Sequence, residues 1–481
     1  MTKGIKTYQT KTKIIATLGP SVNSESKILS LIKSGVDVFR LNFSHGDHKQ
    51  HQQFINKVRR LNEKYDLHTC LLGDLQGPKI RTGNIAPGSV TLKRGKSFYF
   101  INEETVEGDD QIVPINYEAF PRDVKKGDRV LLDDGKIEVK VEHTDEKKYV
   151  KVKVIHGGEL ESKKGVNLPH TKVSLPSLTE KDQKDLDFAL ENNIEWIALS
   201  FVRTADDITE VQDYIAKREK NARVIAKIEK PEAIKNIDSI INQAEGMMVA
   251  RGDLGVELKM EDLPLAQKSI VNKSMAASKP VIIATQIMES MIENPKPTRA
   301  ESNDVANAVI DGADALMLSG ETSIGKYPVR VIETMRKIIK TTEGHPTIYN
   351  REHKISSGSG SYLSDALCFN ATQLASKIGA KGIIGMTQSG YTGFRISSFR
   401  PNSDIYIFSA NPYLLTALNL LWGVRVFYYD KFISTDKTFK DVNSILEDEK
   451  LVKKDDLVIN LASMPIHERR KTNTIKISRI E

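Results

Sequence analysis

The sequence predicts an α/β protein: a (β/α)8 barrel of the TIM type, with a small β-barrel lid domain inserted into it and an α/β domain after it. Short apolar runs of strand length alternate with longer helical patterns along most of the chain. Eight such units extend over roughly 250 residues, the usual size of this barrel. One stretch, residues 80–169, interrupts the alternation with a pattern typical of antiparallel strands. A doubly wound open sheet is the alternative explanation of the alternation.

The chain opens with three strands and two helices. Residues 12–19, 38–44 and 69–76 are apolar runs of strand length. Residues 24–35 form a helical pattern that ends at a glycine, and residues 47–66 form a second one. Strands that alternate with helices in this way are expected to lie parallel, with the helices covering the sheet.

The alternation resumes after the interruption with a helical pattern at residues 179–193. The remaining apolar runs, each followed by a plausible helix, are 196–201, 223–229, 246–254, 280–285 and 313–319. The last of these helices is expected at residues 329–343. These runs bring the predicted number of barrel strands to eight.

The rest of the chain divides into two further units. Residues 80–169 contain alternating runs such as SVTLKRG and KIEVKVE, separated by glycine and aspartate turns, and predict the inserted β domain. A polar linker at 351–361 precedes a third unit. Its predicted strands are 381–387, 404–409, 425–429, 456–462 and 474–480. The expected domains are therefore 1–79 with 170–345, then 80–169, then 346–481.

Composition narrows the class of partner. The chain has 481 residues and a formal charge of +7, from 70 basic and 63 acidic residues, which suits small anions. No dense basic run predicts nucleic-acid binding, and no apolar run approaches the roughly 18 residues of a membrane span. The polar N-terminal stretch lacks the apolar core of a signal peptide. Cys70 and Cys368 lie in apolar segments, which favours buried thiols over a disulfide and predicts a cytoplasmic protein.

Polar residues gather where the predicted barrel strands end. These residues are Arg40, Asn42, Ser44, His45, Asp74, Ser200, Lys227, Glu229, Arg251, Asp253 and Thr285. Any one of them alone is well explained as a helix cap or a surface ion pair. A closed barrel, however, directs all of them to the same mouth, where barrel enzymes carry their catalytic groups.

The residue types indicate the chemistry of this mouth. Glu229 and Asp253 are hard oxygen ligands, which suit Mg²⁺ or Mn²⁺ and not zinc. Lys227 and Arg40 add positive charge, and the stretch GDLG at 252–255 is expected to begin a helix whose N–H groups attract anions. Such a site fits phosphoryl transfer or enolate chemistry.

Several long motifs resemble those of pyruvate kinases, in order, from about residue 11 to the C-terminus. They are TKIIATLGP, RLNFSHG, GDLQGPKIRTG, SKKGVNLP, AKIEKPEAI, MVARGDLGVE, ATQIMESMIENPKPTRAESNDVANAV and DGADALMLSGETSIGKYP. The resemblance implies transfer of a phosphoryl group from phosphoenolpyruvate to ADP, giving pyruvate and ATP. It also implies a homotetramer of D2 symmetry.

The resemblance assigns roles to individual residues. Glu229 and Asp253 are similar to the ligands of the divalent ion, and Lys227 to the residue that neutralises the phosphoryl group and the developing enolate. The expected substrate contacts also include Arg40, Arg81, Ser200, Thr285 and the backbone at Gly252 and Asp253. The expected nucleotide contacts are Asn42, Ser44, His45, Arg81 and Lys164.

The motif DLQGPKIR at 74–81 bears on monovalent cations. Many members of the family require K⁺ and carry an acidic residue at the position of Lys79. With Leu75, Gln76 and Lys79, this chain resembles the members that do not require K⁺. In those members a lysine ammonium can supply the positive charge of the ion. If K⁺ were required, its ligands would be sought among Asn42, Ser44 and Asp74. A solvated lysine at the hinge of the inserted domain is the other explanation.

A loop in the C-terminal domain resembles the family's site for an effector phosphate. It comprises Thr387, Gln388, Ser389, Gly390, Tyr391 and Thr392. An ordinary glycine turn before a helix explains it equally well. A second, glycine-rich loop is expected near 462–478, but His467, Glu468, Arg469, Arg470 and Lys471 stand there instead. Fructose 1,6-bisphosphate is therefore a doubtful effector, although side chains could still hold a phosphate.

Two other functions remain open at this point. Related barrel enzymes use Mg²⁺ and enolpyruvate to make or break carbon–carbon bonds, although Arg81 and Lys164 favour a second, phosphorylated substrate. A metabolite sensor that has lost catalysis is the other alternative, and the presence of all the expected catalytic residues argues against it.

Overall fold

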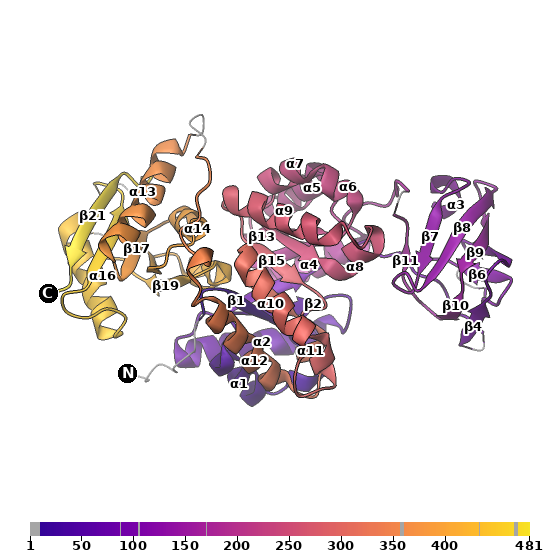
Figure 1. Cartoon of the computed structure of the whole chain (residues 1–481), viewed down its shortest axis with the longest axis horizontal. Coiled ribbons are helices and arrows are strands. Elements are labelled where there is room, and N and C mark those ends of the chain that lie inside the picture. The colour runs from indigo at the N-terminus through magenta and orange to yellow at the C-terminus, as the bar shows by residue number, and fades with distance from the viewer. Residues whose placement is uncertain are drawn as a thin grey trace.

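The computed structural model describes residues 10–86, 88–103, 106–169, 171–355, 360–431, 433–465 and 470–481. Three units lie in a row along the long axis of the molecule (Figure 1). The barrel is in the middle, the inserted β domain lies at one end and the C-terminal domain at the other.

Eight parallel strands form the closed barrel. They are β1 (Lys13–Thr17), β2 (Val38–Asn42), β3 (Cys70–Asp74), β12 (Trp196–Leu199), β13 (Arg223–Ile228), β14 (Gly246–Ala250), β15 (Val281–Ala284) and β16 (Ala315–Leu318). The barrel closes because β1 pairs with both β16 and β2, at Lys13↔Ala315 and Ile15↔Val38. This closure confirms the predicted barrel and excludes the open sheet.

The predicted barrel strands were longer than the observed ones, and the difference is largest for the run 246–254. The run 246–254 was expected to be extended throughout, but β14 ends at Ala250 and helix α8 (Arg251–Glu257) begins at once. The apolar run does end at Ala250, and the polar residues after it belong to the helix. The helix start expected within GDLG is therefore present.

Helices follow the barrel strands as predicted. The α-helices of this part are α1 (Glu25–Ser34), α2 (His48–Tyr65), α4 (Glu180–Glu191), α5 (Ala205–Ala216), α6 (Pro231–Lys235), α7 (Ile237–Gln243), α8, α9 (Leu263–Ala276), α10 (Arg299–Asp311), α11 (Gly320–Ser323) and α12 (Pro328–Thr342). Local sequence explains where several of them start. The side chains of Ser24 and Asp47 accept hydrogen bonds from backbone N–H groups three residues later, and Thr179 forms a capping box with Asp182.

The two faces of each strand pack into different cores. Val224 and Ala226 of β13 belong to the large core between strands and helices, whereas Ile225 belongs to the core inside the barrel. Because side chains alternate along a strand, Lys227 continues the inward-facing series begun by Ile225. The sequence of β13 therefore leads directly from the barrel core to its mouth.

The inserted domain has its own hydrophobic core, which includes Phe98, Phe100 and Phe120. Its elements are β4 (Ser89–Leu92), β5 (Ser97–Ile101), β6 (Ile112–Pro114), α3 (Phe120–Asp123), β7 (Arg129–Leu132), β8 (Ile137–Thr144), β9 (Tyr149–His156), β10 (Gly158–Glu161) and β11 (Val166–Asn167). Its strands form a six-stranded sheet in the order β11-β7-β8-β9-β5-β6 and a two-stranded sheet of β10 and β4. The bridge Arg81↔Gly165 joins the two chain segments that lead into and out of the domain.

The C-terminal domain is an α/β sheet in the order β19-β18-β17-β20-β21, in which β21 is antiparallel. Its elements are α13 (Tyr362–Ile378), β17 (Gly382–Met386), α14 (Tyr391–Ser398), β18 (Asp404–Ser409), α15 (Pro412–Ala417), β19 (Val424–Tyr428), α16 (Thr435–Asp448), β20 (Leu457–Ala462) and β21 (Thr474–Arg479). All five predicted strands are present.

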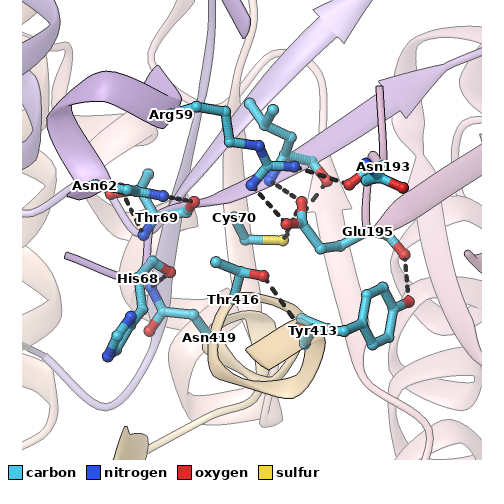
Figure 2. Close-up of polar contacts among 12 residues, drawn as sticks. Arg59, Asn62, His68, Thr69, Cys70, Asn193, Glu195, Tyr413, Thr416 and Asn419 are labelled. Carbon is cyan, nitrogen blue, oxygen red and sulfur yellow. Dashed lines mark hydrogen bonds and ion pairs between the residues drawn. The ribbon is translucent and has the colours of Figure 1, made fainter. Parts of the chain in front are cut away.

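The C-terminal domain covers the N-terminal end of the barrel through α15. The Tyr413 hydroxyl donates a hydrogen bond to the backbone carbonyl of Glu195 over 3.0 Å, and the Trp196 indole N–H donates to Ala417 over 2.9 Å. The Glu195 carboxylate in turn accepts a hydrogen bond from Arg59 (Figure 2) and another from the backbone N–H of Leu71. The opposite end of the barrel, where the polar strand ends meet, lies toward the inserted domain (Figure 1).

Candidate active site

Lys227 lies at the centre of the charged groups in the barrel mouth. Its ammonium is 3.0 Å from Asp74 Oδ1 and 3.1 Å from Glu229 Oε1. It also donates a hydrogen bond of 2.6 Å to the hydroxyl of Ser200, at the end of β12. Burial alone would lower the pKa of Lys227, but the two carboxylates outweigh it and raise the pKa, so the side chain is a cation.

Asp74 holds two cations together. Its second carboxylate oxygen accepts a hydrogen bond of 2.7 Å from Arg40 Nε, and Arg40 also donates to Thr17 over 3.1 Å. Burial would raise the pKa of Asp74, but Lys227 and Arg40 lower it overall. Asp74 is only 1% exposed, so this carboxylate compensates two buried positive charges without solvent. The sequence placed Asp74 among the strand-end residues of the mouth and among the candidates for a monovalent-cation site, and its role as a counterion was not predicted.

The positive charge near Glu229 does not fully offset the effect of burial on its carboxylate. Its Oε2 accepts a hydrogen bond of 2.7 Å from the backbone N–H of Phe201. Burial raises the pKa of Glu229 and the nearby Asp253 carboxylate raises it further, against the opposing effect of Lys227. A divalent cation held by both carboxylates would stabilise their charges, so this donor set fits Mg²⁺ or Mn²⁺. Within the described residues, no group of three or more His, Cys, Asp or Glu side chains could hold a metal, so other ligands would come from substrate or water.

Lys79 pairs with Asp253. Its ammonium lies 3.1 Å from Asp253 Oδ1, and both side chains are about one quarter exposed. In the part of the chain that the structure covers, no hydrogen bond or ion pair joins Lys79 to Asn42, Ser44 or Asp74. The ammonium therefore lies in the mouth, beside an expected metal ligand, and not free in solvent at the hinge.

Thr285 occupies a strained backbone position directly after β15. Its φ is 67°, in the left-handed region that a β-branched residue adopts rarely. The Thr285 hydroxyl accepts a hydrogen bond of 2.7 Å from the backbone N–H of Gly252 and donates one of 2.6 Å to Ala284. A Cβ atom on Gly252 would lie 3.4 Å from this hydroxyl. The threonine and the start of α8 thus form one corner of the mouth, and strain of this kind is typical of ligand sites.

Arg251 supports this corner from behind. Its guanidinium donates to the backbone carbonyls of Thr285 and Gln286 over 2.9 and 3.1 Å and forms an ion pair with Asp304. The sequence suggested that Arg251 faces the mouth with the other strand-end residues. Its contacts show instead that it stabilises the Thr285 turn.

The loop after β2 carries three expected nucleotide contacts, Asn42, Ser44 and His45. The Asn42 carboxamide oxygen accepts a hydrogen bond of 3.1 Å from the backbone N–H of Ser44, and His45 N–H donates to the Asn42 carbonyl. Lys181, on α4, donates to the carbonyl of Phe43 over 2.6 Å and fixes the loop to the helix that follows the inserted domain. Lys181 lies outside the motifs that resemble the pyruvate kinase family, and the sequence analysis did not identify it.

Arg81 and Lys164 lie on the two chain segments that connect the barrel to the inserted domain. Arg81 Nη1 donates to the carbonyl of Lys163 over 3.1 Å. The Lys164 ammonium lies 3.2 Å from Asp133 and 2.8 Å from Glu161, and these carboxylates raise its pKa. Within the described residues, neither side chain forms a hydrogen bond or ion pair with the barrel strands, so both belong to the lid side of the mouth.

Glu257 joins the inserted domain to the barrel and was not predicted. Its Oε1 accepts hydrogen bonds from Asn167 of β11 over 3.0 Å and from Lys230, after β13, over 2.8 Å. Glu257 is 4% exposed, and Asn167 belongs to the last strand before the chain returns to the barrel. This buried contact fixes the base of the inserted domain to α8, the helix that carries Asp253.

The expected effector loop borders a cavity of about 450 Å³ in the C-terminal domain. The loop lies between β17 and α14, with Gly390 at a φ of 88° and its N–H bonded to the Thr387 hydroxyl over 3.0 Å. Gln388, Ser389, Tyr391 and Thr392 line the cavity with Arg470 and Lys471. His467, Glu468 and Arg469, also expected near this loop, lie outside the described residues.

The cysteines and the helices bear on two further points of the sequence analysis. Cys70 and Cys368 are both buried free thiols, as predicted. None of the described helices is long and apolar enough to cross a membrane.

The fold and the charged mouth define the class: a (β/α)8-barrel enzyme with an inserted domain next to a mouth in which buried cations and carboxylates meet. Family models described as "Pyruvate kinase, barrel domain" and "Pyruvate kinase, alpha/beta domain" match residues 9–332 and 365–478. The chain belongs to the pyruvate kinase family, and it is a phosphotransferase. Enzymes of this family transfer the phosphoryl group of phosphoenolpyruvate to ADP in glycolysis.

Individual relatives agree over almost the whole chain. The chain is 40% identical to a pyruvate kinase from Corynebacterium efficiens, over 97% of each sequence. It is 40% identical to pyruvate kinase 2 of Synechocystis sp., over 97% of this chain and 79% of the relative. A crystal structure of a pyruvate kinase from Cryptosporidium parvum is 32% identical, with a TM-score of 0.90 over 98% of this chain and 96% of that one.

Proposed function

We propose that this chain transfers the phosphoryl group of phosphoenolpyruvate to ADP, giving pyruvate and ATP, in the barrel mouth around Lys227. The observation that carries the assignment is the buried contact of the Lys227 ammonium with both Asp74 and Glu229. It keeps the ammonium charged and fixed in position before substrate arrives. A preorganised cation of this kind stabilises charge that develops on a transferring phosphoryl group and on an enolate oxygen.

The substrate contacts follow from this position. Arg40 and Lys227, both held by Asp74, would bind the phosphoryl group, and Ser200 fixes the ammonium from the side of β12. The hydroxyl of Thr285 with the backbone of Gly252 and Asp253 would bind the carboxylate. The strained turn at Thr285 supports this assignment, because it holds the hydroxyl at the N-terminal end of α8.

Glu229 and Asp253 would hold a divalent ion, Mg²⁺ or Mn²⁺. When bound, the ion supplies positive charge that orients the substrate oxygens and the transferring phosphoryl group. The raised pKa of Glu229 supports this role, because burial and the neighbouring carboxylate both destabilise its charged form. Lys227 and the Phe201 N–H orient the two oxygens of Glu229.

The nucleotide would lie between the barrel and the inserted domain, in contact with Asn42, Ser44 and His45 on the barrel side. Arg81 and Lys164 would contact its phosphates from the lid side. Their places on the two connecting segments support this, since a movement of the inserted domain would bring both cations toward the mouth.

We also propose that Lys79 replaces a monovalent cation. Its ammonium lies 3.1 Å from Asp253, which puts a fixed positive charge beside the expected metal ligand. K⁺ is then not required for activity. If K⁺ proves necessary, Asn42, Ser44 and Asp74 are the candidate ligands.

A coupled assay for pyruvate tests the reaction. The purified enzyme is given phosphoenolpyruvate and Mg²⁺, with and without ADP, and ATP is measured in parallel. We expect pyruvate and ATP in equal amounts, and only when ADP is present. Pyruvate formed without ADP, or consumed with another carbon substrate, would favour an enzyme of carbon–carbon bond chemistry.

A second candidate function is binding of an effector phosphate at Thr387–Thr392. The cavity of about 450 Å³, with Arg470 and Lys471 on its wall, favours it over a plain turn. Saturation curves for phosphoenolpyruvate with and without a panel of sugar phosphates, in wild type and Lys471→Gln, test it. A shift of the phosphoenolpyruvate saturation curve by a sugar phosphate that occurs in the wild type and not in Lys471→Gln supports the site.

The proposed setting is a homotetramer in the cytoplasm. The two buried thiols are compatible with a reducing compartment. We place the domain boundaries at 1–79 with 170–345 for the catalytic barrel, 80–169 for the lid and 346–481 for the effector-type domain.

A further inference from the structure

A cavity of about 330 Å³ between the barrel and the C-terminal domain lies next to the pocket beside Lys471, and none of the residues of the barrel mouth borders it. On the barrel side it is bordered by Arg223, the first residue of β13, and by Ser278 and Lys279, which follow α9. On the other side it is bordered by Phe394 and Arg395 of α14. A cavity of this size suits a small molecule and is larger than a bare inorganic ion needs.

Positive charge is in excess around this cavity. Its lining contains three cations, Arg223, Lys279 and Arg395, and one carboxylate, Glu245. The Glu245 oxygens already accept hydrogen bonds from the backbone of Val224 over 2.8 Å and from Gln212 over 2.9 Å. Among the residues that the structure describes, no carboxylate lies within 4.0 Å of Arg223 or Lys279. Burial lowers the pKa of Lys279 although the Glu245 carboxylate opposes this, and its ammonium donates a hydrogen bond of 2.5 Å to the carbonyl of Ala244.

Two guanidinium donors at the cavity have no acceptor. The Nε atoms of Arg223 and Arg395 are both buried and form no hydrogen bond with any described residue. Arg395 is only 9% exposed, and its other nitrogens are held by Ser278 over 2.6 Å and Asp365 over 2.8 Å. Arg223 is held by the Ser389 carbonyl over 2.9 Å and stacks on Phe394, 4.9 Å from the ring centre. Both guanidinium groups line the cavity and are fixed in position by these contacts before any ligand arrives.

We propose that this cavity binds a small phosphate-bearing metabolite, whose phosphate is held by Arg223, Lys279 and Arg395. Two planar guanidinium groups and one ammonium match the oxygens of a phosphate better than a neutral polar ligand. The Phe394 ring leaves an apolar surface for the rest of the molecule. Ser389 and Tyr391 line this cavity and also the pocket beside Lys471, so the two ligands would share one wall.

Calorimetric titration with inorganic phosphate tests the site in the full-length enzyme. The variant is Lys279→Gln, and the matched control is Lys273→Gln on α9, which removes the same charge from an exposed pair with Asp238. We expect the Lys279→Gln variant to lose one phosphate site or to bind there at least about tenfold more weakly, and the control to behave as wild type. The barrel mouth and the effector-type pocket are unchanged in both variants, so identical titrations for all three proteins would overturn the proposal.

Chemical modification of the wild type gives a second test that does not depend on folding of a variant. Pyridoxal 5′-phosphate carries a phosphate and an aldehyde, which condenses with a lysine amine with loss of water, and borohydride then reduces the product to a stable secondary amine. We expect peptide mapping to find Lys279 modified, and inorganic phosphate to protect it. An unmodified or unprotected Lys279 contradicts the proposal. Tighter binding of a tricarboxylate than of phosphate would contradict the assigned ligand class.

Discussion

The Lys227 ammonium lies 3.0 Å from the carboxylate of Asp74, although their strands, β13 and β3, do not pair with each other. The strand β12 lies between them, so the contact crosses the inside of the barrel mouth. Asp74 also binds Arg40 on the neighbouring strand β2. One carboxylate thus sets the position of the two cations proposed to bind the phosphoryl group.

The first prediction concerns Lys227. Its ammonium is proposed to stabilise charge that appears only in the transition state, so Lys227→Met should lower kcat roughly 10³-fold or more, with a smaller change in KM. Steady-state kinetics with both substrates measure this, and circular dichroism checks the fold. A folded variant with nearly normal kcat would show that another group has this role.

The second prediction concerns the proposed metal ligands. Asp253→Asn removes one charged oxygen ligand, so activity should be abolished at ordinary Mg²⁺ concentration while the fold is retained. Activity is measured against Mg²⁺ and Mn²⁺ concentration. Curves that coincide with those of the wild type would exclude Asp253 as a ligand. Asp436→Asn, which removes an exposed carboxylate that pairs with Lys476 in the C-terminal domain, controls for a general loss of charge.

The third prediction concerns the charge of Lys79. The wild type should work at nearly full rate with Mg²⁺ and a bulky organic cation alone, and Lys79→Glu should be slower and respond to added K⁺. The measurement is activity against KCl at constant ionic strength, since screening alone alters the binding of charged substrates. A wild-type enzyme that needs roughly tens of millimolar K⁺ for activity, at constant ionic strength, would contradict this role of Lys79.

The fourth prediction concerns stability and pH at Asp74. Its pKa in the folded protein is below the ordinary value of 3.8, so its contribution to stability is present above pH 3.8 and is lost as the pH falls through the lower, folded value. Asp74→Asn leaves two buried cations without this counterion and should cost about 3–5 kcal/mol at pH 7. The difference in melting temperature between the wild type and Asp74→Asn should be the same at pH 7 and pH 5, and it should become smaller only below pH 3.8.

A matched control separates this effect from loss of any carboxylate. Asp436 pairs with Lys476 over 2.8 Å but is 86% exposed. Asp436→Asn should therefore leave the melting temperature nearly unchanged. Equal losses in the two variants would mean that burial of the Asp74 pair is not the reason for its effect.

The fifth prediction concerns assembly. A homotetramer should have four times the mass of the 53.8 kDa chain. Light scattering at micromolar concentration measures it. A mass near that of one chain would contradict the proposed tetramer.

Local periodicity explains what could be predicted from the sequence alone. The eight barrel strands were recognisable because each apolar run alternates with a helical pattern. Lys227 and Glu229 could be expected to meet because side chains two apart on a strand share one face, and they lie 3.1 Å apart. The position of strand ends in a barrel likewise placed Asp253 and Thr285 at the mouth.

Only the tertiary structure could decide contacts between distant parts of the chain. The contact of Arg223 with Ser389 and that of Asn167 with Glu257 depend on how the domains pack, which no short-range pattern encodes. The end of β14 at Ala250 also differed from prediction, because whether a polar residue continues a strand or begins a helix depends on its tertiary neighbours.

The mouth itself combines both kinds of information. The sequence determined which charged residues lie at the strand ends, because both the residue types and the local pattern of apolar and polar residues are properties of the sequence itself. Closure of the barrel decided that Asp74 would be shared by Arg40 and Lys227, and the return of the chain from the inserted domain decided where Arg81 would lie. Charges act over distances of a few ångström, so which of them interact depends on the folded geometry and not on their separation in sequence.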